Sequence, residues 1–233
     1  MTKAFQIYTT DVLKYGSTWG FPEEEFSDPA TWKELWPDEG LGYPPTRDWK
    51  PEDRFFPFLE DGPLGESPKF TDREIALVER LAFAWSSETR DLAEVHFGAP
   101  ALNCRKPFFD FITGLDLPNV QIIKTKTYLE HFEEWLDEPT WYINVHNKID
   151  CIDADKSRVA STPSTLWPGR IDHRVEMSRI EFKTVSLRGD AIAGHDLWRD
   201  ATYPNALYCS EDFAQSIKNR KFRSLRFLPV EVI

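Results

Sequence analysis

The residue types that most often hold a metal ion are spread thinly along this chain of 233 residues. None of its five histidines belongs to an HExxH motif or to a Cys/His cluster with ligand spacing. The nearest approach to a ligand pair is His131 with Glu134, on what reads as one helical face. An exposed amphipathic surface explains this pair more simply than a metal site does, so we expect no metal ligands.

A group of acids in the second half faintly resembles a calcium-binding loop, namely Asp150, Asp153 and Asp155 followed by Ser157. If Asp153 is position 1, Arg158 occupies the position that needs glycine and Ser164 the position that needs glutamate. We therefore expect these carboxylates to be solvated or to cap local amides. A small hydrolase that uses Asp150 or Asp153 as its acid stays open as an alternative.

Nucleophilic chemistry has little support in the sequence. Cys104 follows His96 by eight residues, but a catalytic thiol–imidazole pair is set by the fold and not by this spacing, so we expect a structural thiol. The sequence contains no phosphate-binding glycine loop and no GxSxG elbow. Cys104, Cys151 and Cys209 are widely spaced, which indicates reduced thiols. We expect no enzyme, no catalytic residue and no cofactor.

Charge is unevenly divided along the chain. The 28 Lys+Arg and 39 Asp+Glu give a net charge of −11, of which residues 1–116 carry −10 and residues 117–233 carry −1. Direct nucleic-acid binding is disfavoured, because neutralising phosphates needs a basic face. The N-terminal residues lack the apolar run of a signal peptide, and no run is long enough for a membrane span. We expect a cytoplasmic protein that does not bind membranes.

Much of this acidity lies in one aromatic-rich segment. Residues 20–66 hold 13 acidic and four basic side chains, and nine of the seventeen prolines lie between residues 20 and 68. Proline fixes φ and removes a hydrogen-bond donor, so long helices and strands are not expected here. Tryptophan and phenylalanine recur through the segment, which indicates loops anchored to a core by aromatic rings.

Two capping boxes predict helices. The Thr-Asp-Arg-Glu box at 71–74, followed by apolar residues at helical spacing, predicts a helix over about 72–95 with a break near 86–87. The box at 127–130 predicts a short helix that Pro139 ends. We expect Trp85, Phe132 and Trp135 to be core residues.

A third helix is predicted to begin after Ser210, which has the position of an N-cap. Glu211 and Asp212 would lie in its first turn, and Phe213, Ala214 and Ile217 would form its apolar stripe. A basic cluster follows, made of Lys218, Arg220, Lys221, Arg223 and Arg226. Cations at a helix C-terminus explain it most simply, and a phosphate-binding patch is the alternative.

Strand-like runs lie at 119–124, 140–146, 177–187, 191–198 and 224–232, with a hairpin turn at 188–190. They do not alternate regularly with long helices, so a doubly wound parallel sheet is not expected. We predict an α+β fold, a mostly antiparallel sheet with a few packed helices, preceded by a Pro/Trp-rich, loop-heavy N-terminal segment. We expect an acidic, aromatic-rich region at 1–100, packed on the core, and an α+β domain at 101–233.

Four motifs follow one another in the second half. The first comprises Tyr142, Asn144, Asn147, Asp150 and Asp153, and the second is Gly-His-Asp-Leu-Trp-Arg at 194–199. The third is Ser-Glu-Asp-Phe at 210–213, and the last comprises Leu225, Phe227, Pro229 and Val230. Over about residues 104–233 this pattern resembles the bacterial polymorphic-toxin immunity proteins called immunity protein eleven, with Ser224 where a glycine is usual.

The resemblance implies a non-enzymatic inhibitor in interbacterial competition, which binds a toxin delivered between neighbouring cells and so protects the producer. It implies no catalytic residue and does not define the toxin. Many toxins that act in the cytosol attack nucleic acids and so carry basic clefts. An acidic inhibitor can bind such a cleft by imitating the phosphate backbone.

We hypothesise that acids and tryptophans of the segment 20–66 contact the toxin, the acids by steering and the rings as anchors. The residues are Glu23, Glu24, Glu25, Asp28, Trp32, Trp36, Asp38, Glu39, Asp48, Trp49, Glu52 and Asp53. The alternative is that this segment wraps its own core. A Trp-rich glycan-binding module is a further function that stays open.

Overall fold

Two compact units make up the computed structural model. Unit 1 comprises residues 1–10, 114–120 and 145–233, and unit 2 comprises residues 11–113 and 121–144. Within them the structure describes residues 3–9, 17–20, 58–59, 62–63, 69–79, 82–85, 92–98, 101–163, 171–175, 185–204, 206–222 and 224–233. Whether the regions 1–100 and 101–233 are separate domains stays a prediction.

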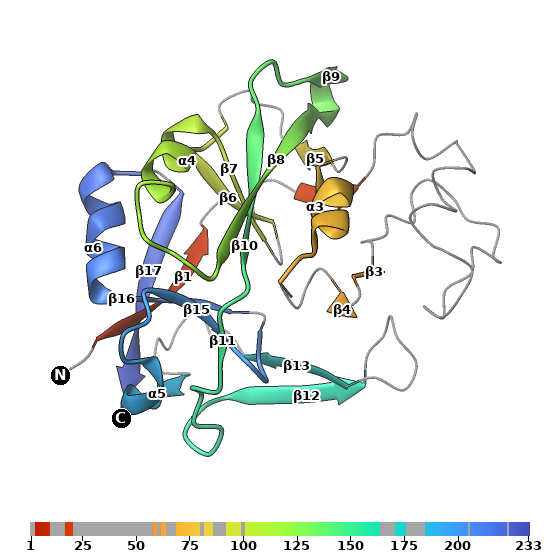
Figure 1. Cartoon of the computed structure of the whole chain (residues 1–233). Helices are drawn as coiled ribbons and strands as arrows, with labels where there is room; N and C mark the ends of the chain where they lie inside the picture. Colours follow the sequence, from red (N-terminus) through yellow and green to blue (C-terminus); the bar gives the residue numbers. More distant parts are fainter. Residues whose placement is uncertain are drawn as a thin grey trace. The chain divides into compact units, whose positions relative to one another are not determined.

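Unit 1 is built on a six-stranded sheet (Figure 1). Its strand order is β11 (Lys148–Ile149), β15 (Leu197–Asp200), β16 (Leu207–Ser210), β1 (Ala4–Thr9), β17 (Leu225–Val232) and β14 (Ser186–Leu187). The inner pairings are antiparallel, whereas β11 with β15 and β14 with β17 are parallel. A separate antiparallel pair, β12 (Val159–Pro163) and β13 (Ile171–Val175), belongs to the same unit.

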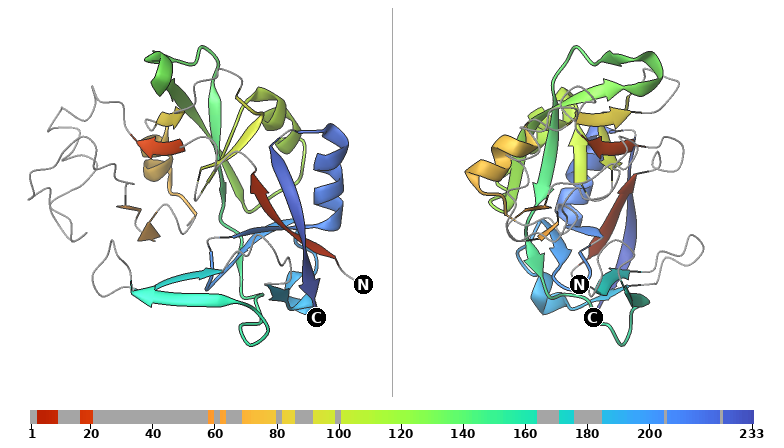
Figure 2. Two further views of the ribbon diagram at one scale, coloured as in Figure 1. Left: turned by 180° about the vertical axis from the view of Figure 1, so that it is seen from behind. Right: turned by 90° about the vertical axis from the view of Figure 1, so that its right-hand side faces the viewer.

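Helix α6 (Glu211–Arg220) begins where the sequence predicts it. Ser210 is its N-cap, because its Oγ accepts the Phe213 N–H at 3.1 Å. The apolar stripe of Phe213, Ala214 and Ile217 is buried, and the helix packs on β1 and β16 (Figure 2). Lys221 ends the helix in the left-handed conformation, with φ 59°.

Unit 2 contains a second sheet, in the order β2 (Ser17–Gly20), β5 (Ala82–Trp85), β8 (Val120–Leu129), β10 (Thr140–Val145), β7 (Ala101–Cys104) and β6 (Val95–Gly98). The short strand β9 (Glu134–Trp135) also pairs with β8. Helices α3 (Asp72–Val78) and α4 (Lys106–Ile112), and the two-stranded pair β3 (Phe58–Leu59) with β4 (Gly62–Pro63), belong to this unit.

The predicted helix after the box at 127–130 is wrong, because β8 continues to Leu129. Buried and exposed residues alternate along this strand, and Thr125, Thr127 and Leu129 lie on its buried face. The Thr125 and Thr127 hydroxyls lie 3.3 and 3.0 Å from the Thr140 hydroxyl on β10. Thr127, which has the spacing of an N-cap, therefore makes a cross-strand contact and does not cap a helix. Only a 3₁₀ turn, η2 (Glu130–Phe132), follows.

Two further predictions fail where strand pairing or glycine geometry outweighs local pattern. The helix predicted over 72–95 ends at Val78, and Ala82–Trp85 forms β5, which pairs with β2 and β8. The strand predicted at 191–198 and the turn at 188–190 are replaced by helix α5 (Gly189–Ile192) and strand β15. Gly194 separates the two, and its φ of 79° favours glycine.

The strands predicted at 119–124, 140–146 and 224–232 are confirmed as β8, β10 and β17. Of the run at 177–187 only residues 185–187 are described, and they contain β14. The fold is α+β, with mixed sheets and a few helices. No helix among the described residues combines the length and the apolar character needed to cross a membrane.

Candidate functional site

The first two motifs meet along one seam of unit 1, which we define as residues 147–153 together with 195–200. Strand β11 runs parallel to β15, with Lys148 opposite Arg199 and Ile149 opposite Asp200. On its other side the same stretch bridges β14, since Ile152 pairs with Leu187 and the Arg188 N–H donates to the Cys151 carbonyl at 2.8 Å. Residues 147–153 are thus held from both sides.

A buried carboxylate fixes this seam. Asp200 is 1 % exposed, and its Oδ2 accepts the N–H groups of Cys151 and Ile152 at 2.9 and 2.8 Å. Its Oδ1 accepts the N–H groups of Thr202 and Tyr203 at 2.8 and 2.9 Å. Four charge-assisted bonds to amides offset the cost of removing the carboxylate from water. The arrangement occupies both oxygens and gives Asp200 a structural role.

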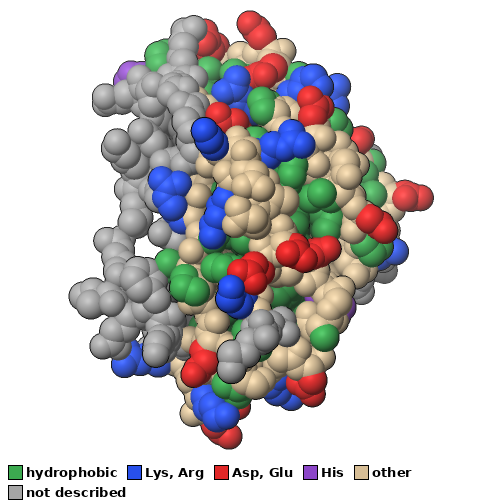
Figure 3. All heavy atoms as spheres, turned by 90° about the vertical axis from the view of Figure 1, so that its left-hand side faces the viewer, with side chains coloured by type: hydrophobic (Ala, Val, Ile, Leu, Met, Phe, Trp, Pro, Cys, Tyr) green, Lys and Arg blue, Asp and Glu red, His purple; other side chains and the backbone are tan. Residues whose placement is uncertain are grey.

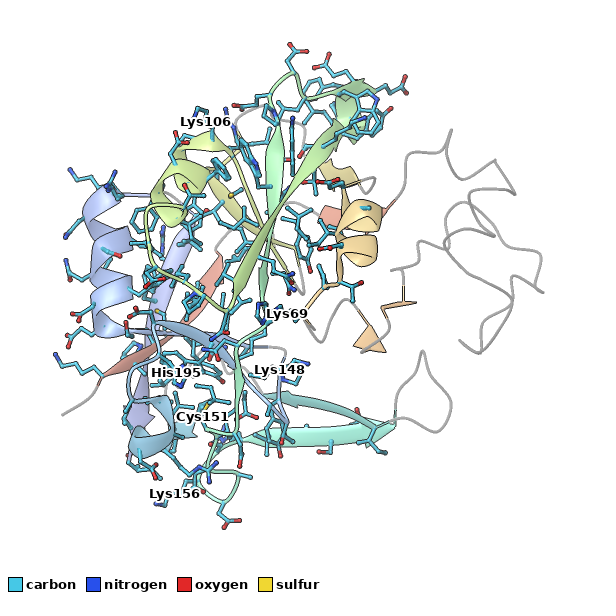
Figure 4. All side chains as sticks on the ribbon, viewed as in Figure 1. Lys69, Lys106, Lys148, Cys151, Lys156 and His195 are labelled. Carbon is cyan, nitrogen blue, oxygen red and sulfur yellow. The ribbon has the colours of Figure 1, made fainter. Side chains whose placement is uncertain are left out.

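Asn147 and His195, one from each motif, also meet in the seam; Figure 4 labels His195. The Asn147 side-chain amide lies 3.1 Å from His195 Nδ1 and donates to the Leu197 carbonyl at 3.0 Å. The Asn147 carbonyl accepts the Arg199 N–H at 2.8 Å. The spacing of these motif residues therefore reflects the pairing of two chain segments.

An apolar cluster backs the seam. Trp198 and Tyr208 stack with ring centroids 6.4 Å apart, and both are almost fully buried beside Cys151. Burial raises the pKa of Tyr208 well above its ordinary value and raises the pKa of Cys151 to about 12. Neither group ionises near neutral pH, so this cluster offers packing and not acid–base chemistry.

The other thiols are buried as well. Cys104, Cys151 and Cys209 are all free in the structure, and burial also raises the pKa of Cys104 and Cys209. Thiolates are the reactive form of cysteine, and burial disfavours them. The expectation that Cys104 is a structural residue is confirmed by its exposure of 1 %.

The group that resembles a calcium loop is a capped turn. The Asp153 Oδ1 accepts the N–H groups of Asp155 and Lys156 at 3.1 and 3.2 Å. Asp150 forms an ion pair with Arg188 at 2.8 Å, at exposed side chains. The expectation of locally capping carboxylates is confirmed, and these contacts give no support to a hydrolase acid at either position.

Three members of the basic cluster, Lys218, Arg220 and Lys221, lie at the end of α6, as the helix-terminus interpretation predicts, whereas Arg226 lies on β17. Lys218 and Arg220 belong to the last turn, and the Lys218 ammonium lies over the Phe5 and Phe227 rings at 4.7 and 5.4 Å. A cavity of about 330 Å³ is lined here by Lys218, Lys221, Arg226, Phe222 and Phe227, among others. Arg223 lies outside the described residues.

The face of the molecule on which α6 lies in Figure 1 carries charges of both signs. In Figure 3, basic and acidic side chains alternate there with hydrophobic ones over the described residues. The carbonyls at the C-terminus of α6 also carry a partial negative charge, which disfavours binding of an anion at the basic cluster. The phosphate-patch alternative therefore gains no support.

In unit 2 the first motif continues into the sheet. Tyr142 and Asn144 on β10 are both at most 1 % exposed, and the Asn144 amide donates to Gln121 Oε1 at 3.2 Å. Gln121 in turn bonds both backbone groups of Phe70, with distances of 2.7 and 2.8 Å. Phe70 packs against the Tyr142 ring at a centroid distance of 5.9 Å. These motif residues are again parts of the architecture.

Comparison with known families covers the part of the chain that contains these motifs. The model of the immunity protein family Imm11 matches residues 107–232, more than half of the chain. The chain belongs to the Imm11 family. Membership in an immunity protein family indicates protection against a toxin by an inhibitor that binds it. No curated protein matches the chain.

Membership in Imm11 leaves the toxin-contact residues open. All twelve hypothesised contacts between Glu23 and Asp53 lie outside the described residues. The His131–Glu134 pair is not on one helix face, because His131 belongs to η2 and Glu134 to β9. Within the described part of the chain, no group of three or more His, Cys, Asp or Glu residues is placed to hold a metal ion.

Two features of this Imm11 chain were not predicted from its sequence. One is the role of Asp200, although an acid that ends the buried strand Leu197–Asp200 needs dedicated hydrogen-bond partners. The other is the exposure of Trp135: its predicted place in the core is wrong, since the residue is 41 % exposed. The strand pairing that turns this ring outward could not be read from the helix-like spacing.

Replacing the buried carboxylate tests whether Asp200 fixes the seam. Asp200→Asn keeps the side-chain shape but turns an NH₂ group toward two backbone N–H donors. We expect a loss of about 3 kcal/mol in the free energy of unfolding, measured by urea denaturation. The exposed Asp155→Asn serves as control and should change it by less than about 0.5 kcal/mol. Equal midpoints for both variants would contradict the role of Asp200.

The thiol of Cys151 gives a pH dependence with a definite sign. Burial, and then the charge of Asp200, raise its pKa from 9.0 to about 12 in the folded chain. Above about pH 9 the Cys151 thiol loses its proton in the unfolded chain but keeps it in the folded chain. The free energy of unfolding that depends on this thiol is therefore complete below about pH 9 and is lost as the pH rises toward 12. Between about pH 8 and 10 the urea midpoint should fall more steeply for the wild type than for Cys151→Ala. Parallel curves would refute this assignment.

Proposed function

We propose that this chain binds and neutralises a cognate antibacterial toxin in the cytosol of the cell that produces both. The observation that carries the proposal is the Imm11 match over residues 107–232. The packed seam supports it, because the motif residues Asn147 and His195 contact each other and the motif acids Asp150 and Asp153 have structural partners. An inhibitor needs a stable frame and a complementary surface, and these motifs supply a frame.

The charge distribution supports a basic partner. The chain carries a net −11, concentrated in residues 1–116, and an excess of one sign accelerates encounter with the opposite sign. Nucleases bind phosphate through basic clefts, so a nuclease toxin suits this inhibitor. Within the proposal, the acids and tryptophans of 20–66 form one contact region.

Co-expression tests the proposal. If a large protein with a variable C-terminal domain is encoded immediately upstream, that domain is the toxin domain to use. We expect the full chain to restore growth of cells that express this domain and to co-purify with it. A chain that neither restores growth nor co-purifies would refute the proposed function.

Charge reversal tests the acidic contact region within the same complex. Glu23→Lys, Glu24→Lys and Glu25→Lys together should lower the association rate constant about tenfold or more at low salt and flatten its salt dependence. A control set with the same charge change is Glu79→Lys, Asp116→Lys and Asp155→Lys, at exposed positions. If the two sets behave alike, steering by residues 23–25 is excluded.

A further inference from the structure

Trp135 of unit 2 is a large aromatic residue that is exposed to solvent. We define the tip as residues 130–137, the turn that follows β8 and contains η2 and β9, at the top of Figure 1. Trp135 in this tip is 41 % exposed. Leaving so large an apolar surface in water costs hydrophobic stabilisation, and exposed Trp is strongly enriched among residues that dominate binding interfaces.

The backbone of the tip is held in place. Tyr128 pairs with Trp135 and Leu129 with Glu134, and the Leu136 N–H donates to the Thr127 carbonyl at 2.9 Å. The turn passes through Glu133 at φ 51°, a conformation that costs free energy for a residue other than glycine. A turn kept at this cost places Trp135 at a defined position at the end of β8.

The indole is also oriented. The Tyr128 ring packs edge-on against it at a centroid distance of 5.2 Å, and the Lys126 ammonium lies 5.7 Å from its centroid. These contacts restrict the rotamers of Trp135 while they leave two fifths of the residue accessible. A ring oriented before binding loses less conformational entropy when a partner covers it.

Acidic residues flank Trp135 along the chain, while Lys126 contacts its ring. Glu133 and Asp137 are exposed and Glu134 is half-buried, whereas Glu138, just beyond the tip, is paired with Arg105. An apolar anchor with exposed acidic neighbours is complementary to an apolar pocket with a basic rim. A second copy of this chain is a poor occupant, since each copy carries a net −11.

We propose that the tip is a docking element for the toxin, with Trp135 inserted into an apolar pocket on a basic surface of the toxin domain. Glu133 and Asp137 face cations at the rim of that pocket. This inference rests on the proposed function and adds a contact surface to it. The tip lies inside the range matched by the Imm11 model but outside the four motifs, so none of the residues that we assign to the frame is part of it.

Truncating the anchor tests the proposal with the full chain and the upstream toxin domain. Trp135→Ala should raise the dissociation constant at least about 30-fold, mostly through faster dissociation. Trp135→Phe should fall between that variant and the wild type. Ile171→Ala is the matched control, because Ile171 is also an exposed large apolar side chain, at 48 % exposure, on β13 of unit 1. It should leave the dissociation constant unchanged.

A substitution at one of the acidic residues beside Trp135 tests the proposal even if Trp135→Ala does not fold. Asp137→Lys should slow association, whereas Asp116→Lys, also at an exposed acid, should not. If the wild type binds and the tip variants bind equally well, the docking proposal is wrong and the proposed function stands. If the wild type does not bind at all, the proposed function fails. Self-association of the wild type that Trp135→Ala abolishes would make the tip a contact between copies and overturn the proposal.

Discussion

The carboxylate of Asp200 is the interaction on which the architecture of unit 1 most depends. Four backbone amides from two separate stretches, 151–152 and 202–203, converge on its two oxygens. Such an arrangement is close to all-or-none, because a buried charge that loses part of its hydrogen-bond shell becomes strongly destabilising. Correct pairing of β11 with β15 brings the oxygens and the amides together, so the carboxylate favours one register over its alternatives.

The contacts of the seam explain the spacing of the motif residues in this chain. Asn147 reaches both His195 and the Leu197 carbonyl, and Asp153 caps the turn that directly follows the pairing of Ile152 with Leu187. The motif residues of this chain can thus be understood as parts of a frame. We propose that the toxin is contacted by surface that these motifs do not include, such as the tip around Trp135.

Local chemistry in the sequence was sufficient where the structure depends on neighbours along the chain. Ser210 as an N-cap and Asp153 as an amide cap follow from spacing of two to three residues, and both are present. The strands β10 and β17 follow from their β-branched and aromatic content. Elements that depend on distant partners were not predictable. Thr127 has the spacing of a capping residue, but its partner is Thr140 on the neighbouring strand. Trp135 has the spacing of a core residue, but pairing of β9 with β8 leaves it exposed.

The frame centred on Asp200 and the toxin contact that we propose at residues 130–137 involve different residues. Hydrogen–deuterium exchange of the full chain, alone and with the upstream toxin domain, measures both in one experiment. We predict slow exchange of the amides of Cys151, Ile152, Thr202 and Tyr203 in either state, and slower exchange of residues 130–137 in the complex than in the free chain. Fast exchange of the four amides in the free chain, or a complex in which residues 130–137 exchange as they do in the free chain, would contradict this account.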